Sequence, residues 1–248
     1  MWSKKINIKL KIAYDGTNFH GWQSQPEKRT IQTEIEKSLS KIFNNKEIKI
    51  IGSGRTDSGV HAYEQIANIF IDTDMKELNI KKAINRYLPD DIFINDCSVV
   101  NNDFHSRFSA KKREYIYYIS NNYLPSKRLY RWYYKYTYDI SLLNKCADSL
   151  IGEHNFSLLS KASSETQNKV CNIHTAKWHF VDDKAIFKIS ANRFLQHMVR
   201  LIVGTMMEVA RGRISFLEFE KILLQKDPNY VALRAPAKGL FLNKVYYE

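Results

Sequence analysis

Residues 52–61 read GSGRTDSGVH, and they connect two segments that are rich in β-branched and aromatic residues. This composition predicts that residues 47–51 and 62–70 form strands on either side of the loop. Three of the chain's nine glycines lie in the loop. Such a concentration indicates a backbone that needs positive φ or that comes very close to another group. We therefore expect a strand, a tightly shaped loop and a second strand.

Asp57 is the candidate for chemistry in this loop. A carboxylate beside Arg55 and Thr56 tends to stay ionised, because a cation and hydroxyl donors favour its charged form. An ionised carboxylate can act as a nucleophile. The alternative from the residues alone is a tight turn in which Asp57 caps backbone amides, which is the common use of such loops. A dinucleotide fingerprint and a phosphate loop are both excluded, because the glycine spacing and the following helix that they require are missing.

The overall composition favours a globular protein with a polyanionic partner. The 248 residues, 44% of them hydrophobic, are enough for one large domain or two packed halves. Lysine and arginine number 38 against 26 aspartate and glutamate, so the net charge is +12 and nucleic acid is the leading partner. Three scattered cysteines, Cys97, Cys146 and Cys171, argue against a disulfide framework and favour the cytoplasm. We expect no membrane association and no signal peptide, since no apolar run reaches about 18 residues.

Charged and aromatic residues concentrate between residues 104 and 136. These 33 residues hold eight lysines and arginines, a single acidic residue and eight of the chain's fifteen tyrosines. Basic groups neutralise phosphates, and aromatic faces stack on unpaired bases at about 1–3 kcal/mol per base. The combination favours RNA, although for most of these tyrosines packing within a pair of strands is the better explanation.

Helices are predicted from hydrophobic spacing and from capping residues. Thr30 and Asp139 are predicted to cap two helices, and Ser215 opens a capping box for a third. A further helix over residues 80–87 stops at a Leu-Pro pair, and another carries apolar residues from 194 to 209. Strands alternate with these helices and no low-complexity linker interrupts them. The sequence therefore predicts an α+β protein with a mixed sheet and helices packed on it.

The loop at 52–61 resembles the active-site motif of the TruA-type tRNA pseudouridine synthases, in which Gly-Arg-Thr-Asp is followed by Gly-Val-His. Other blocks that are similar to the family, in the family's order, are residues 14–25, 88–92, 104–110, 192–212 and 235–242. The resemblance covers nearly the whole chain. It implies the pseudouridine synthase fold, with two pseudo-symmetric halves that share a mainly antiparallel sheet flanked by helices, around a central cleft. We expect the halves at residues 1–105 and 106–248.

The resemblance also implies roles for individual residues. Asp57 attacks C1′ of a flipped-out uridine or assists elimination to a glycal, and the sequence leaves both routes open. Tyr115 stacks on the uracil and takes the C5 proton. Arg200 pairs with the catalytic aspartate, the alternative being a solvated helix cation. Leu240 lines the base pocket, and a core leucine is equally consistent. No cofactor is required.

The implied substrate is the anticodon stem-loop of tRNA, at positions 38, 39 and 40, bound by a homodimer in which one tRNA touches both subunits. The residues predicted to contact substrate are Arg55, Thr56, His61, Arg107, Lys111, Lys112, Arg113 and Leu240. We expect no metal site, because His174 and His179 would point to opposite faces of one strand. Two alternatives are a non-catalytic basic RNA-binding protein and a nucleotide-dependent enzyme that uses the glycine loop.

Overall fold

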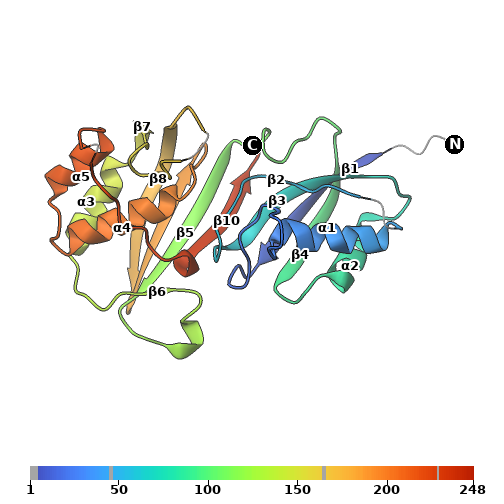
Figure 1. Ribbon diagram of the computed structural model, residues 1–248, viewed down its shortest axis with the longest axis horizontal. Coiled ribbons are helices and arrows are strands. Elements are labelled where there is room, and N and C mark those ends of the chain that lie inside the picture. Colours follow the sequence, from blue (N-terminus) through green and yellow to red (C-terminus); the bar gives the residue numbers. More distant parts are fainter. Residues whose placement is uncertain (1–4, 45–46, 164–165, 228) are drawn as a thin grey trace. The chain divides into compact units, whose positions relative to one another are not determined.

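The chain forms two compact units, each built of strands and helices. The computed structural model describes residues 5–44, 47–163, 166–227 and 229–248. One unit comprises Met1–Lys111 with Leu242–Glu248, and the other comprises Lys112–Phe241. Each unit packs helices on a mainly antiparallel set of strands (Figure 1). The α+β class predicted from the sequence is confirmed.

The first unit has the strand order β4-β1-β3-β10, and β2 pairs with β3. Its strands are β1 (Ile6–Tyr14), β2 (Ile51–Gly52), β3 (His61–Ile71), β4 (Ile92–Val100) and, from Leu242 onward, β10 (Leu240–Tyr246), and its helices are α1 (Ile31–Ile42) and α2 (Glu77–Tyr87). β1 is antiparallel to both β3 and β4. Alternate residues of β1 and the apolar stripe of α1 are fully buried. The core of this unit therefore includes one face of the sheet and the inner sides of the two helices.

The second unit has the strand order β5-β9-β8-β7, and β6 pairs parallel with β5. Its strands are β5 (Lys112–Ser120), β6 (Trp132–Tyr133), β7 (Gly152–Asn155), β8 (Val170–Val181) and β9 (Lys184–Ala191). Its helices are α3 (Ile140–Ser149), α4 (Met198–Ala210) and α5 (Phe216–Leu223). Every residue of α4 except Arg200 and Glu208 is buried. α4 is therefore a core helix with two polar side chains at its boundary.

The predicted helix caps are confirmed. The Thr30 side chain accepts a hydrogen bond from the Thr33 N–H at the start of α1. Asp139 Oδ1 accepts from two backbone N–H groups at the start of α3. Ser215 and Glu218 form the reciprocal capping box that opens α5. Short-range hydrogen bonds of this kind depend only on neighbouring residues, which is why the sequence reveals them.

The strand predicted at residues 47–51 is mostly wrong, because regular pairing is limited to β2. Ile48 and Ile50 are buried, as a strand pattern would require. The Ile50 N–H, however, donates to Glu36 Oε1 at 3.1 Å instead of to a neighbouring strand. Only Ile51 and Gly52 pair with β3. The Glu36 side chain of α1 thus takes the place that a backbone carbonyl of a neighbouring strand would have in a sheet.

The helix predicted to include Phe194 begins later, at Met198. His197 has a left-handed backbone with φ 65° and supplies no side-chain cap. A left-handed residue interrupts α-helical geometry, so the segment before it turns instead of extending the helix. The Met198 N–H donates to the Leu195 carbonyl within this turn.

The boundary between the units differs from the expected division at residue 105. The Lys111 N–H donates to the Tyr246 carbonyl at 2.8 Å, and Tyr247 Oη donates to the Ser106 carbonyl at 2.7 Å. The Phe104 and Tyr247 rings lie 5.0 Å apart. These contacts hold the C-terminal segment in the first unit, together with residues up to 111. None of the helices that the structure describes is long and apolar enough to cross a membrane.

Candidate active site

The first part of the 52–61 loop is fixed to β3 by one buried glutamine. The Ser53 N–H donates to the Ile66 carbonyl at 2.7 Å, and Ser53 Oγ donates to Gln65 Oε1 at 2.6 Å. Gln65 Nε2 donates in turn to the Gly54 carbonyl at 2.9 Å. Gln65 is fully buried, so its side chain is already ordered by the core. The loop therefore leaves the sheet along a defined path.

Thr56, the residue before the candidate nucleophile, is buried and held from two sides. Its Oγ1 lies 2.8 Å from Tyr14 Oη, and its carbonyl accepts from the Trp22 N–H at 3.1 Å. Gly21 has φ +87°, and a Cβ there would lie 2.5 Å from the Thr56 carbonyl oxygen. A side chain at position 21 would thus push the loop away. The structure pairs the Thr56 hydroxyl with Tyr14, and its predicted contact with substrate stays a prediction.

The part of the loop after Asp57 rests on a turn at residues 15–20. The Phe19 carbonyl accepts from the Gly59 N–H at 3.2 Å and from Ser58 Oγ at 3.1 Å. A Cβ on Gly16 would lie only 2.0 Å from the Val60 carbonyl oxygen, which shows how closely the turn and the loop approach. The loop is therefore anchored just after Asp57 as well as just before it.

His61 fixes the same turn from within the unit. It is 1% exposed, and its Nδ1 accepts from the Gly16 N–H at 3.1 Å. Asp15 Oδ1 lies 3.1 Å from the same nitrogen and also accepts from the Thr17 N–H. These contacts give His61 a part in holding the turn. The contact with RNA predicted for His61 stays a prediction.

Asp57 is half-buried between these two anchored stretches, while Arg55 is exposed. The Val60 N–H donates to the Asp57 carbonyl at 3.1 Å, so the backbone of the candidate nucleophile is itself part of the turn. Because the backbone on both sides of Asp57 is fixed by hydrogen bonds, the position of its carboxylate is restricted. Such preorganisation is what nucleophilic attack at a defined atom requires.

In the second unit, Arg200 is tied to the segment at residues 235–239. Arg200 Nε donates to the Ala235 carbonyl at 2.8 Å, and the Ala235 N–H donates to the Arg200 carbonyl at 3.1 Å. The side chain is half-buried on an otherwise apolar helix. Arg200 is therefore a held cation, which argues against the alternative of a solvated one. Its predicted pairing with Asp57 stays a prediction.

Tyr117 clamps the same segment from β5. Its side chain is fully buried, and Oη donates to the Pro236 carbonyl at 2.7 Å. Burial raises the pKa of the Tyr117 hydroxyl well above its usual value, and the positive charge of Arg200 lowers it by a smaller amount. The hydroxyl therefore keeps its proton and remains a donor. A Cβ on Gly239 would lie 2.7 Å from Tyr117 Cζ. The clamp sets the position of Leu240, which follows directly and is 5% exposed.

Tyr115, the residue predicted to stack on uracil, lies on β5 opposite Ile189. It is 8% exposed, and its ring meets Phe194 edge to face at a centroid distance of 5.1 Å. Phe194 lies in the segment that precedes α4, the helix that carries Arg200. The packing orients the Tyr115 ring, and its role toward a base stays a prediction.

The predicted basic contacts differ in exposure. Arg107 and Lys111 are exposed, and Lys112 and Arg113 are half-buried. Arg113 Nη1 donates to the Asn192 carbonyl at 2.9 Å. Arg107 lies over the ring of Phe108 at 5.4 Å. Of these groups, Arg107 and Lys111 are presented most openly to a large polyanion.

The predicted residues fall in both units. The first unit carries Arg55, Thr56, Asp57, His61, Arg107 and Lys111, and the second carries Lys112, Arg113, Tyr115, Arg200 and Leu240. Sequence reasoning assigned no role to Tyr14, Phe19 or Gln65, which hold the Asp57 loop. The signal for the first two was the block at residues 14–25, which resembles the family. Gln65 is a polar residue in a predicted strand, and such residues are buried only when they are hydrogen-bonded.

No cluster of three or more potential metal ligands occurs among the residues that the structure describes. His174 and His179 are both exposed on β8. A bulge between Ile173 and Thr175 interrupts the alternation from which we predicted that the two histidines point to opposite faces.

Comparisons with known proteins assign the family. The family model described as tRNA pseudouridine synthase matches residues 11–109 and 146–248. Proteins named tRNA pseudouridine synthase A are similar along nearly the whole chain. One from Borrelia duttonii is 44% identical over 97% of this chain and 99% of its own length. One from Borreliella afzelii is 45% identical, again over 97% and 99%. One from Anoxybacillus flavithermus is 40% identical over 97% and 98%.

Among solved structures, a crystal structure of a Cbf5-Nop10-Gar1 complex covers 82% of this chain and 54% of its own, at 12% identity and a TM-score of 0.32. The assignment rests on the family model and on the sequence relatives, which extend over both units. The blocks that the sequence analysis identified lie within the matched residues, except for Ala110 at the end of one block. The chain belongs to the tRNA pseudouridine synthase family.

Proposed function

We propose that Asp57 is the catalytic carboxylate with which this tRNA pseudouridine synthase isomerises uridine to pseudouridine at positions 38, 39 and 40 of the anticodon stem-loop. The observation that carries the assignment is the anchoring of the loop on both sides of Asp57, by Tyr14 before it and by Phe19 after it. A fixed carboxylate in a half-buried loop suits attack on a sugar carbon. The family membership of the chain supports the same reaction.

In the proposed reaction the N1–C1′ bond of the uridine breaks, and a C5–C1′ bond forms after the base has turned. Asp57 either attacks C1′ directly or assists elimination to a glycal. The C5 proton leaves and N1 gains a proton, so the product is an isomer of the substrate. We assign two roles to Tyr115, stacking on the face of the uracil and removing the C5 proton. The orientation of its ring is fixed by Phe194.

Arg200 and Leu240 complete the proposed catalytic set. We assign Arg200 the pairing with the Asp57 carboxylate, because charge-assisted pairs hold a carboxylate in one orientation. We assign Leu240 the apolar wall of the base pocket. The clamp on residues 235–239 supports both assignments, because it fixes Arg200 and the residue before Leu240 to one another.

Binding must supply the energy that removes the target base from its stack, a few kcal/mol in typical base-flipping enzymes. We propose that RNA phosphates and bases contact the loop residues Arg55, Thr56 and His61 and a second group, which consists of Arg107, Lys111, Lys112 and Arg113. The net charge of +12 supports an extended contact with tRNA. We further propose a homodimer, in which one subunit binds the tRNA elbow while the other receives the anticodon stem-loop.

We propose the cytoplasm as the site of this reaction. The three cysteines are buried and free. Burial raises the pKa of the Cys97 thiol to about 11 and that of Cys146 to about 12, so both stay protonated and unreactive at neutral pH. Three protonated, buried thiols suit a reducing compartment.

Tritium release tests the proposed function. Unmodified tRNA that carries tritium at uridine C5 is incubated with the protein, without nucleotide or metal. Pseudouridine formation releases the label to water, because C5 becomes the carbon bonded to the sugar. Binding without release would instead identify a non-catalytic RNA-binding protein, and release that requires a nucleotide would support the nucleotide-dependent alternative. Sequencing the modified tRNA then identifies which of the three positions react.

Two measurements test the assembly. Light scattering should give about twice the chain mass of 29.1 kDa. An isolated anticodon stem-loop should react much less efficiently than full-length tRNA, because it lacks the elbow that the other subunit binds. A monomer that modifies the stem-loop as well as the whole tRNA would contradict the proposed dimer.

A further inference from the structure

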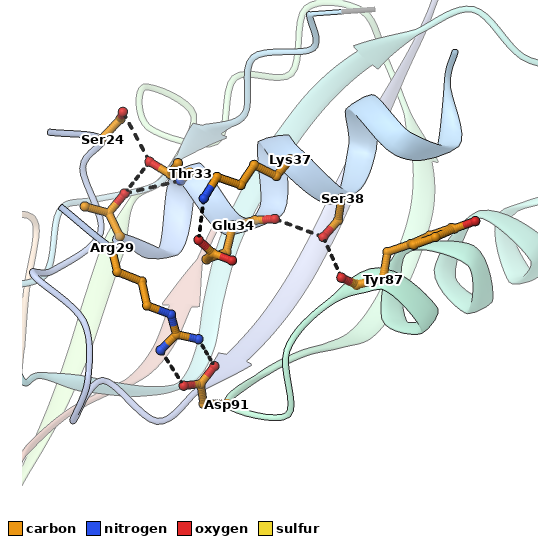
Figure 2. Close-up of polar contacts among 9 residues, drawn as sticks. Ser24, Arg29, Thr33, Glu34, Lys37, Ser38, Tyr87 and Asp91 are labelled. Carbon is orange, nitrogen blue, oxygen red and sulfur yellow. Dashed lines mark hydrogen bonds and ion pairs between the residues drawn. The ribbon is translucent and has the colours of Figure 1, made fainter. Parts of the chain in front are cut away.

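Arg29 and Asp91 form a two-pronged ion pair at the edge of the turn that supports the Asp57 loop. Arg29 Nη1 donates to Asp91 Oδ2 at 2.8 Å, and Nη2 donates to Oδ1 at 2.9 Å. Figure 2 shows the guanidinium and the carboxylate facing each other with both bonds drawn. Such paired bonds fix the relative orientation of two planar groups, in addition to their distance. The pair thus fixes the orientation of the Arg29 guanidinium relative to the Asp91 carboxylate, in addition to bringing opposite charges together.

The pair holds both ends of the turn at residues 15–20. The Asp91 carbonyl accepts from the Asp15 N–H at 3.0 Å, and the Arg29 carbonyl accepts from the His20 N–H at 2.9 Å. Arg29 Cζ also lies 4.0 Å from the centroid of the Phe19 ring. A flat guanidinium stacks on an aromatic face in a way that an ammonium cannot reproduce. The turn is therefore fixed from outside by Arg29 and Asp91.

The turn carries this constraint to the loop through Phe19. Its ring is 2% exposed beneath Arg29, and its carbonyl accepts from the Gly59 N–H and from Ser58 Oγ. Ser58 is the residue next to Asp57. The Phe19 ring and carbonyl thus connect the ion pair to the part of the loop just after Asp57. A displaced Phe19 would move the two groups that hold the loop just after Asp57.

We propose that Arg29 and Asp91 are positioning residues for the Asp57 carboxylate, acting through Phe19 without touching the substrate; this rests on the proposed function. The two side chains are 36% and 24% exposed, and ion pairs at this exposure contribute little to folding stability. Reaction rates are far more sensitive to position, since a displacement of about 1 Å can cost on the order of 100-fold. Loss of the pair therefore reduces turnover more than it reduces stability.

The test compares Arg29→Ala and Asp91→Asn with Lys11→Ala. Lys11 and Glu64 form another ion pair of the first unit, at 3.2 Å, with side chains 38% and 20% exposed, so it matches the first pair in exposure. We expect kcat to fall about 10- to 100-fold in the Arg29 and Asp91 variants, with KM within about twofold. Lys11→Ala should keep both constants, and melting temperatures should differ little among the three. Unchanged kcat in the Arg29 and Asp91 variants would overturn the proposal.

Two further variants separate positioning from charge. Arg29→Lys keeps the charge but loses the two-pronged geometry and the flat stack on Phe19, so kcat should lie between those of wild type and Arg29→Ala. The double variant Arg29→Ala/Asp91→Asn should be no slower than the slower single variant, because the two residues act as one unit. Full activity of Arg29→Lys, or multiplied losses in the double variant, would contradict the proposal.

Hydrogen exchange of the Gly59 amide gives a readout that needs no turnover. We expect faster exchange in Arg29→Ala and Asp91→Asn, because the Phe19 carbonyl that accepts from this amide is no longer fixed, and unchanged exchange in Lys11→Ala. Unchanged Gly59 exchange in the Arg29 and Asp91 variants would overturn the proposal even if kcat fell. A wild-type protein that releases no tritium would instead overturn the proposed function, and the exchange data would still decide whether the pair holds the loop.

Discussion

The two units hold their candidate catalytic residues in different ways. In the first unit, Asp57 lies in a loop fixed by hydrogen bonds to side chains and carbonyls of a neighbouring turn. In the second, Arg200 projects from α4, a helix in which every other residue except Glu208 is buried. Asp57 is positioned by hydrogen bonds between neighbouring segments, and Arg200 mainly by a helix packed in the hydrophobic core. Substitutions around Asp57 should therefore change rate, whereas substitutions around Arg200 should change rate and stability together.

Asp57→Asn should produce the largest effect, with turnover lowered by at least about 1,000-fold. The amide keeps the volume of the carboxylate but cannot act as the nucleophile, so tRNA binding should stay within a few-fold of wild type. Single-turnover tritium release and filter binding measure the two quantities. Asp90→Asn, at an exposed aspartate of the same unit, is the control and should be fully active. Appreciable residual activity in a clean preparation would exclude Asp57 as the catalytic group.

Arg200→Ala should lower turnover by about 100-fold, comparable with the loss of one charge-stabilising donor in an active site. It also removes the Nε bond to the Ala235 carbonyl, so a moderate fall in melting temperature should accompany the loss. Arg200→Lys is the matched variant that keeps the charge. A large fall in melting temperature with full activity of the folded fraction would make Arg200 purely structural.

Gly16, which contacts the Asp57 loop, and Gly204, which lies in α4, allow the hydrogen-bonded loop and the packed helix to be compared directly. A Cβ on Gly16 would lie 2.0 Å from the Val60 carbonyl oxygen, and a Cβ on Gly204 in α4 would lie 1.8 Å from the Leu233 carbonyl oxygen. Gly204→Ala should destabilise the protein by about 1–3 kcal/mol, since the packed helix has to move. Gly16→Ala should instead lower kcat by on the order of 10-fold, through displacement of the Asp57 loop.

Thermal melting and kcat, measured on both glycine variants, check this contrast. Gly54→Ala, where an added Cβ meets nothing within 4 Å, is the control for folding. Equal losses of stability in Gly16→Ala and Gly204→Ala would contradict the difference between a loop held by hydrogen bonds and a helix held by core packing.

The smallest effect is expected from replacing Lys111, Lys112 and Arg113 together with alanine. Each phosphate contact contributes about 0.7–0.9 to the slope of log affinity against log salt. Because Arg113 is already bonded to the Asn192 carbonyl, we expect the magnitude of the slope to fall by about 1.5–2, the share of two phosphate contacts, instead of the share of three. Affinity for tRNA, measured over a series of salt concentrations, gives this slope. An unchanged slope would place the RNA contact elsewhere.

The sequence predicted local features better than it predicted contacts between distant segments. Thr30, Asp139 and Ser215 cap helices as expected, because each cap involves residues two or three positions away. The strand at 47–51 was wrong because the Glu36 side chain bonds to the Ile50 N–H across the fold.

The same limit applies to the site. The Asp57 loop was predicted from its residues and from its resemblance to the family. Its supports were not, because the pairing of Tyr14 with Thr56 and of Phe19 with Gly59 joins residues about forty positions apart. Neither pairing follows from propensity or from periodicity, since both depend on how the chain folds back on itself.

The placement of Leu242–Glu248 in the first unit has a consequence for synthesis on the ribosome. The contact between Tyr247 and the Ser106 carbonyl joins residues 141 positions apart, so it cannot form until nearly all of the chain has been translated. The second unit is one continuous segment, Lys112–Phe241, whose residues have all been translated by then. Domains generally fold as units during translation. The unit that carries Asp57, although most of its residues are translated before those of the second unit, must wait for Leu242–Glu248, and a polypeptide released after Phe241 would lack a complete first unit.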